Sequence, residues 1–178
     1  MGRRRIFADD ADRERFITRL GEEVGEHDVR LYLFTCMHNH AHLVCETPRA
    51  NLSVFMHKLQ TAYTVYYNLR HRRSGHLMEG RFRDKLVAGD EYLLKLTRYV
   101  HLNPVFVRGV KDLPLKERVE YLRAYPWSSY RGYAGLKKPY AFMDEAPVLE
   151  LTGTGSKKSQ QAYRRFVEAG VAKTDEEF

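Results

Sequence analysis

The chain has 178 residues, of which 30 are Lys or Arg and 23 are Asp or Glu, so its formal charge at neutral pH is +7. With 43% hydrophobic and 30% charged residues, it has the composition of a globular protein with one main core, which excludes a largely disordered chain. No stretch approaches the roughly 18 apolar residues of a membrane span. The N-terminus lacks the apolar core of a secretory signal, so we expect no membrane partner and a cytoplasmic location.

The first predicted element is an amphipathic helix near the N-terminus. Asp9 or Asp10 can cap its first turn, because a short acidic side chain accepts hydrogen bonds from the free amides there. Phe16, Leu20 and Val24 recur every four residues, which is the spacing of one helix face. This stripe predicts a helix that packs on the core.

Two strands are predicted next, over residues 29–37 and 40–46, from their β-branched and aromatic residues. Only His38 and Asn39 lie between the two runs. Asn tolerates the positive φ that a two-residue turn requires, so the segment reads as an antiparallel hairpin. His38 places an imidazole at the turn, outside the register of the strands.

The second strand carries a pair of histidines, His40 and His42. Alternate residues of a strand point to the same face, so both imidazoles can reach one divalent ion. Two ligands do not make a tight site, and histidines with this spacing also occur as exposed or hydrogen-bonded residues. The pair is therefore a candidate metal site that needs a further ligand from elsewhere in the chain.

Further helices follow the hairpin. Residues 52–69 carry a helical apolar stripe, with Asn51 as a possible cap, and GRFRDKLV at 80–87 predicts a short strand with arginines on one face. Asp90 opens another helix, which must end near Asn103 because the following Pro104 disfavours helical geometry at the residue before it.

Tyr99 and Asn103 are four residues apart on this helix, so they share one face. An amide oxygen there can serve as a third ligand, and a phenol beside a metal is a plausible nucleophile. The alternative is that Tyr99 packs in the core and Asn103 only caps the helix before the proline. Spacing alone leaves both interpretations open.

Positive charge is concentrated in three short runs. Such runs favour a polyanionic partner, because each phosphate that is neutralised releases counterions, although a solvated basic surface gives the same pattern. The runs contain Arg3, Arg4 and Arg5, then Arg70, Arg72 and Arg73, then Arg81 and Arg83 with Lys85.

Four ordered blocks resemble a known family. NHAHLV, SGHLMEGRFRDKLV, YLLKLTRYVHLNPV and YPWSSYRGYAG are similar to the IS200-like tyrosine transposases of the HUH class, and specifically to the branch associated with repetitive extragenic palindromes. The resemblance implies an α+β, ferredoxin-like antiparallel sheet with helices packed on one face. It implies a transposase domain over residues 1–150. The composition of residues 151–178 predicts a polar linker and a C-terminal helix.

The resemblance also implies a site and a reaction. His40 and His42 would bind Mg²⁺ or Mn²⁺, with Asn103 as a possible third ligand, and Tyr99 would attack a phosphodiester of single-stranded hairpin DNA. The products would be a 5′-phosphotyrosine and a free 3′-hydroxyl. The eight arginines named above would follow the DNA backbone, and the protein would act as a monomer or homodimer.

One departure from the family pattern leaves a second function open. Family members begin with a strand before the basic segment, which here is GRRRIF, so the resemblance implies that the first strand is missing. Loss of that strand would leave the hairpin with an unpaired edge. The competing hypothesis is a domesticated module that binds hairpin DNA or RNA without cutting it.

Overall fold

The computed structural model describes residues 4–78, 80–153 and 156–172. Two strands and a series of helices follow one another along the chain. In order, the elements are α1 (Asp10–Glu26), β1 (Arg30–Cys36), β2 (Ala41–Glu46), α2 (Leu52–Arg70), α3 (Asp90–Leu102), the 3-10 turn η1 (Asn103–Val105), α4 (Leu115–Ala124), α5 (Tyr130–Tyr133), α6 (Ala146–Glu150), α7 (Ser156–Glu168) and η2 (Ala169–Ala172).

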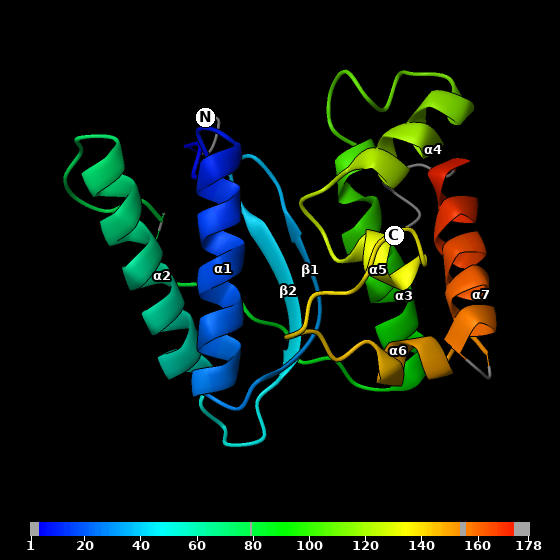
Figure 1. Ribbon diagram of the computed structural model, residues 1–178, viewed down its shortest axis with the longest axis horizontal. Helices are drawn as coiled ribbons and strands as arrows, with labels where there is room; N and C mark the ends of the chain where they lie inside the picture. The colour runs from blue at the N-terminus through cyan, green and yellow to red at the C-terminus, as the bar shows by residue number, and fades with distance from the viewer. Residues whose placement is uncertain (1–3, 79, 154–155, 173–178) are drawn as a thin grey trace.

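The predicted α+β class is confirmed: an antiparallel pair, β1 and β2, lies between two groups of helices. Figure 1 shows α1 and α2 side by side on one side of the strands, and α3 with α4 and α7 on the other. Helices thus pack on both faces of the hairpin, whereas the family resemblance implied helices on one face. In the part of the chain that the structure describes, no helix has the length and apolar character needed to cross a membrane.

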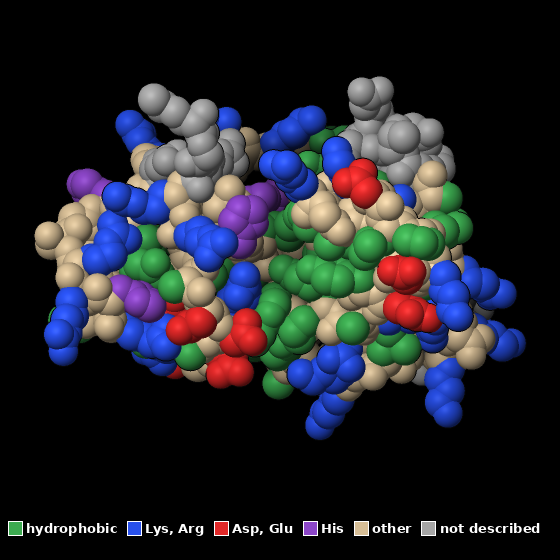
Figure 2. Space-filling model, turned by 90° about the horizontal axis from the view of Figure 1, so that it is seen from above, with side chains coloured by type: hydrophobic (Ala, Val, Ile, Leu, Met, Phe, Trp, Pro, Cys, Tyr) green, Lys and Arg blue, Asp and Glu red, His purple; other side chains and the backbone are tan. Residues whose placement is uncertain are grey.

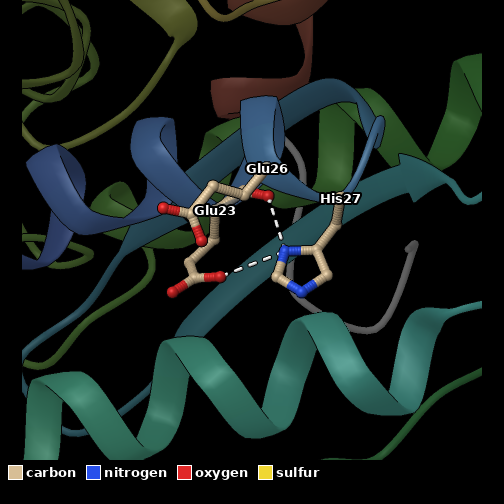
Figure 3. A group of neighbouring side chains, drawn as sticks. All are labelled: Glu23, Glu26 and His27. Atoms are coloured by element: carbon tan, nitrogen blue, oxygen red, sulfur yellow. Dashed lines mark hydrogen bonds and ion pairs between the residues drawn. The ribbon is translucent and has the colours of Figure 1, made fainter.

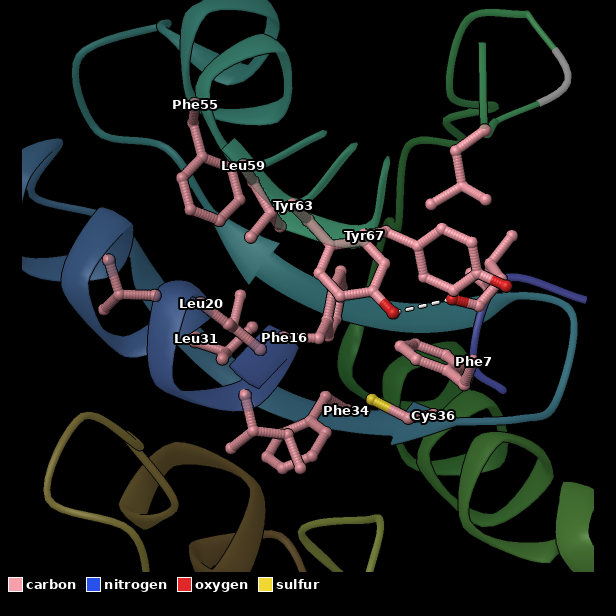
Figure 4. Close-up of a cluster of buried hydrophobic side chains, with 14 of the residues drawn as sticks. Phe7, Phe16, Leu20, Leu31, Phe34, Cys36, Phe55, Leu59, Tyr63 and Tyr67 are labelled. Carbon is pink, nitrogen blue, oxygen red and sulfur yellow. Dashed lines mark hydrogen bonds between the residues drawn. The ribbon is translucent and has the colours of Figure 1, made fainter. Parts of the chain in front are cut away.

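The first core lies between α1, α2 and one face of β1 (Figure 4). Phe16 and Leu20 of the predicted α1 stripe are buried there, as are Phe55 and Leu59 of α2. The Tyr63 hydroxyl of α2 donates a 2.6 Å hydrogen bond to the carbonyl of Ile6, which fixes the N-terminal segment to this core. Ile6, which follows Arg4 and Arg5, is therefore held in place next to the hairpin.

The start of α1 is fixed by its predicted cap. Asp9 is the N-cap residue, and its side chain accepts from the amide of Asp12 at 3.1 Å. Arg70, at the end of α2, donates to Asp9 and to the buried carboxylate of Asp12 at 2.6 to 2.7 Å. These ion pairs join the first turn of α1 to the last turn of α2.

The face of β2 that carries His42 turns toward α3 because of the strand register. Leu43 packs against the first core, whereas Val44 is buried in the second core with Val100 of α3. Since side chains alternate along a strand, His42 lies on the same face as Val44. The hairpin therefore presents its histidines to α3 rather than to α1 and α2.

The edge of β1 that does not pair with β2 is covered by two later segments. Their backbone hydrogen bonds are Cys36 N–H to Trp127 O at 2.8 Å, Ser129 N–H to Phe34 O at 3.0 Å and Asp144 N–H to Leu31 O at 2.9 Å. An open strand edge exposes unpaired backbone groups, and these contacts satisfy them on this side. Residues far along the chain thus become part of the support for the hairpin.

Two local predictions were wrong. Residues 80–87 form no strand in the structure, and Leu86 is 89% exposed. A strand exists only when a neighbouring strand accepts its backbone hydrogen bonds, and apolar alternation alone does not supply that neighbour. Asn51 precedes α2 as predicted, but its side chain makes no cap; it donates instead to the carbonyl of His27 at 2.9 Å.

Candidate active site

The two histidines of the hairpin converge. His40 stands just before β2 and His42 lies within it, and their Nε2 atoms are 3.0 Å apart. Two cis ligands of an octahedral ion with bonds of about 2.1 Å lie about 3.0 Å from each other, so the spacing fits one divalent ion. The prediction that both imidazoles point to the same face is confirmed.

Asn39 orients the first of these imidazoles. Its side-chain oxygen lies 2.7 Å from Nδ1 of His40. Because an amide oxygen only accepts hydrogen bonds, Nδ1 carries the proton and Nε2 is the nitrogen with the lone pair, which faces Nε2 of His42 in this structure. This is the arrangement that fixes ring and tautomer in metal-binding histidines. The sequence pattern indicates Asn39 only as a turn former and does not predict this role.

His38, by contrast, takes no part in the convergence. Its side chain is exposed, and its carbonyl accepts from the amides of Ile6 and Phe7 at 3.2 and 3.3 Å. The residue therefore joins the turn of the hairpin to the N-terminal segment through its backbone.

Tyr99 reaches the histidines from α3. Its ring lies edge-on to that of His42, with 6.1 Å between the ring centroids, and 36% of the residue is exposed. Helix α3 ends at Leu102, as the following proline predicted. A partly exposed phenol beside two convergent imidazoles is accessible to a large substrate.

Asn103 is not brought to the histidines in the same way. Its side-chain amide donates to the Tyr99 carbonyl at 2.9 Å, so it stabilises the end of α3. It is not among the residues that line the cavity described below, whereas Tyr99 is. Its role as a third ligand stays a prediction.

The histidines and Tyr99 share a cavity of about 1000 Å³ between the hairpin, α2, α3 and the segment 80–87. Its basic lining residues are Arg4, Arg81, Arg83 and Lys85, and its acidic ones are Glu46 and Asp84. Figure 2 shows Lys and Arg side chains on both sides of His side chains, next to a band of hydrophobic ones. The cavity therefore offers cationic and apolar surface next to the candidate site.

A second tyrosine in the cavity, Tyr32, differs in its bonding. Its hydroxyl donates to the carboxylate of Glu46. Burial and this hydrogen bond raise the pKa of Tyr32 to about 12, which favours the neutral phenol. Of the two phenols in the cavity, Tyr99 is thus the better candidate for a nucleophile.

The arginines predicted to bind nucleic acid differ in their surroundings. Arg81 and Arg83 are exposed at the cavity, and Arg4 lines it. The Arg70 guanidinium is already bound by two aspartates, and the Arg73 guanidinium lies over the Tyr67 ring. Arg5 and Arg72 are exposed, and Arg3 lies outside the described residues.

Among the described residues, one group of three possible metal ligands lies elsewhere, at the end of α1. Glu23, Glu26 and His27 bring their ligand atoms within 4.8 Å of one another (Figure 3). The buried Glu23 carboxylate already pairs with Arg19 and lies 3.1 Å from His27 Nδ1. Because the Arg19 guanidinium is already paired with the Glu23 carboxylate, we interpret this cluster as ion pairing that stabilises the end of α1.

Comparison with known proteins adds to this geometry. Residues 1–103, which include both histidines and Tyr99, match the family described as "Transposase IS200 like". The chain belongs to the IS200-like transposase family. No curated protein and no solved structure gives a significant match.

Membership of the IS200-like transposases supports an enzyme that acts on DNA. The family match ends at Asn103, so the helices from α4 onward lie outside it. Those later segments nevertheless supply the contacts to β1 described above. The site is thus built from family residues that are supported by residues beyond the match.

Proposed function

We propose that this IS200-like transposase cuts and rejoins single-stranded hairpin DNA through a covalent tyrosine intermediate, with Tyr99 as the nucleophile. The observation that carries the proposal is the meeting of His40, His42 and Tyr99, from two distant segments, at one cavity with basic lining. A candidate nucleophile beside candidate metal ligands in one cavity is the combination expected of an active site, and the family match is consistent with it.

The proposed reaction is a transesterification. The phenolic oxygen of Tyr99 attacks the phosphorus atom and the bond to the 3′-oxygen breaks. A tyrosine 5′-phosphodiester and a free 3′-hydroxyl result. The phenol loses one proton and the leaving oxygen gains one, so no other reactant is consumed. Attack by the 3′-hydroxyl of another DNA end reverses the step and joins the strands.

The resemblance to the family implies Mg²⁺ or Mn²⁺, and an imidazole pair that leaves positions open for an amide oxygen and water can hold such an ion. His40 and His42 would hold it through Nε2, Asn39 would keep the His40 ring in the right tautomer, and Asn103 is the candidate third ligand. When bound, the ion would polarise the scissile phosphate and stabilise the charge that develops on its oxygens. Exposed Arg81 and Arg83 would bind the phosphates on either side.

The test is formation of an SDS-resistant adduct between the protein and hairpin oligonucleotides made from DNA that flanks the gene, in the presence of Mn²⁺. Tyr99→Phe should abolish the adduct. Tyr92→Phe is the matched control, because Tyr92 lies two turns away on α3 and is 37% exposed, against 36% for Tyr99. An adduct that persists in Tyr99→Phe, or binding without any adduct, would contradict the proposal; the latter would favour a binding module.

A further inference from the structure

A network of buried, hydrogen-bonded polar side chains connects α3, which carries Tyr99, to the hairpin, which carries the histidine pair. His101 is completely buried on α3, two residues from Tyr99. Its Nε2 lies 2.9 Å from the Ser129 hydroxyl, and its Nδ1 lies 2.7 Å from the Tyr163 hydroxyl of α7. The proposed reaction uses none of these three groups.

Ser129 connects this network to the hairpin. Its hydroxyl accepts from the amide of Phe34 at 3.0 Å, and its own amide donates to the Phe34 carbonyl at 3.0 Å. Phe34 neighbours Thr35, which pairs with His42 across the two strands. One serine therefore holds β1 behind His42 and, at the same time, holds α3 through His101.

A neutral His101 satisfies every hydrogen bond in this network. A neutral imidazole has one donor and one acceptor nitrogen, and each faces a hydroxyl that can take the complementary part. A buried polar network whose members are all satisfied fixes one arrangement of the elements that it connects.

We infer that Ser129, His101 and Tyr163 are positioning residues that set the placement of Tyr99 relative to the histidine pair. A tyrosine hydroxyl lies roughly 9 Å from the axis of its helix, so a rotation of about 10° displaces it by about 1.5 Å. A misplacement of about 1 Å can cost about 100-fold in rate. Segments beyond the family match thus determine the geometry of the reaction that the family residues perform.

The structure provides matched controls for both hydroxyls. Ser128 is buried like Ser129, but its hydroxyl accepts from the amide of Tyr130 and makes no contact with His101. Tyr130 is buried like Tyr163, but its hydroxyl donates to Glu168. A loss of general stability affects controls and test variants alike, whereas loss of positioning affects only the test variants.

This inference rests on the proposed function, and the first experiment measures single-turnover adduct formation at saturating DNA. Ser129→Ala and Tyr163→Phe should each lower the rate at least about tenfold. DNA affinity should stay within about twofold, because the DNA-binding surface is unchanged. Ser128→Ala and Tyr130→Phe should keep the rate within about twofold. Because both hydroxyls act on His101, the double variant should lose much less than the product of the single losses. Equal rates in Ser129→Ala and Ser128→Ala would overturn the inference.

Hydrogen exchange separates failure of the inference from failure of the proposed function. Ser129→Ala should speed exchange at the Phe34 amide and at the α3 amides near His101 by about tenfold, and Ser128→Ala should not. If the wild type forms no adduct and this pattern holds, the proposed function fails while the coupling stands. If exchange is the same in both variants, the inference is wrong, whatever the activity.

Discussion

Replacement of Asn39 by alanine tests the metal site through a residue that does not itself bind the ion. The 2.7 Å contact between the Asn39 side-chain oxygen and His40 Nδ1 fixes the tautomer of the ring. Loss of the outer hydrogen-bond partner of a metal-binding histidine typically costs about 1.4 to 2.8 kcal/mol of ion binding. At about 1.4 kcal/mol for each factor of ten, Asn39→Ala should weaken ion binding about 10- to 100-fold.

The assay is the rate of adduct formation as a function of Mn²⁺ concentration. Asn39→Ala should move the half-maximal concentration upward by this factor, with a similar rate at saturating Mn²⁺. Asn39→Asp keeps an acceptor at the same place and should stay close to the wild type. His38→Ala is the neighbouring control, because the His38 side chain is exposed. An unchanged Mn²⁺ dependence in Asn39→Ala would refute the assigned role of Asn39.

Three further predictions concern stability and DNA binding. Tyr63→Phe leaves a buried carbonyl without its 2.6 Å donor and should lower the free energy of unfolding in urea by about 1 to 3 kcal/mol. A side-chain hydrogen bond from Arg70 lowers the pKa of Asp9 from 3.8 to about 2. The folded pKa lies below the unfolded one, so this pair contributes stability that is present above about pH 4 and lost as the pH falls toward 2. Arg70→Gln should therefore flatten the pH dependence of unfolding in that range. Removing both Arg81 and Arg83 should reduce the slope of log affinity against log salt by about 1.4 for single-stranded DNA.

Each of these predictions has a control. Tyr66→Phe removes a long, exposed 3.5 Å hydrogen bond and should change unfolding much less than Tyr63→Phe. Arg49→Gln removes an exposed ion pair with Asp28 and should leave the acid range unchanged. Lys116→Ala, at an exposed position on α4, should not alter the salt slope. If a variant and its control changed the free energy of unfolding, its pH dependence or the salt slope equally, the explanation given for that variant would be contradicted.

Local features of the fold were predictable because short segments encode them. The cap at Asp9, the end of α3 before Pro104 and the turn between β1 and β2 depend on neighbours within a few residues. The turn forms where it was predicted, but Asn39 does not take the positive φ from which it was inferred. The prediction that the two imidazoles point the same way came from strand alternation and is confirmed, although His40 lies just before β2. Local chemistry therefore identified the elements that carry the candidate site.

Contacts between distant segments could not be predicted in this way. Residues 80–87 have the composition of a strand but lack a partner, and Ser129 pairs with Phe34, 95 residues earlier in the chain. The signal at Asn39 was available, because metal-binding histidines usually donate their second ring nitrogen to an oxygen. His101 lies at the centre of the buried network, but its place in the sequence is that of an ordinary helix residue and did not predict this role.

The most direct test of the central claim is to digest the covalent adduct with protease and nuclease and to sequence the modified peptide by mass spectrometry. We predict a nucleotide joined through its 5′-phosphate to Tyr99, with a free 3′-hydroxyl on the released strand. A nucleotide on any other residue, or one joined through a 3′-phosphate, would contradict it.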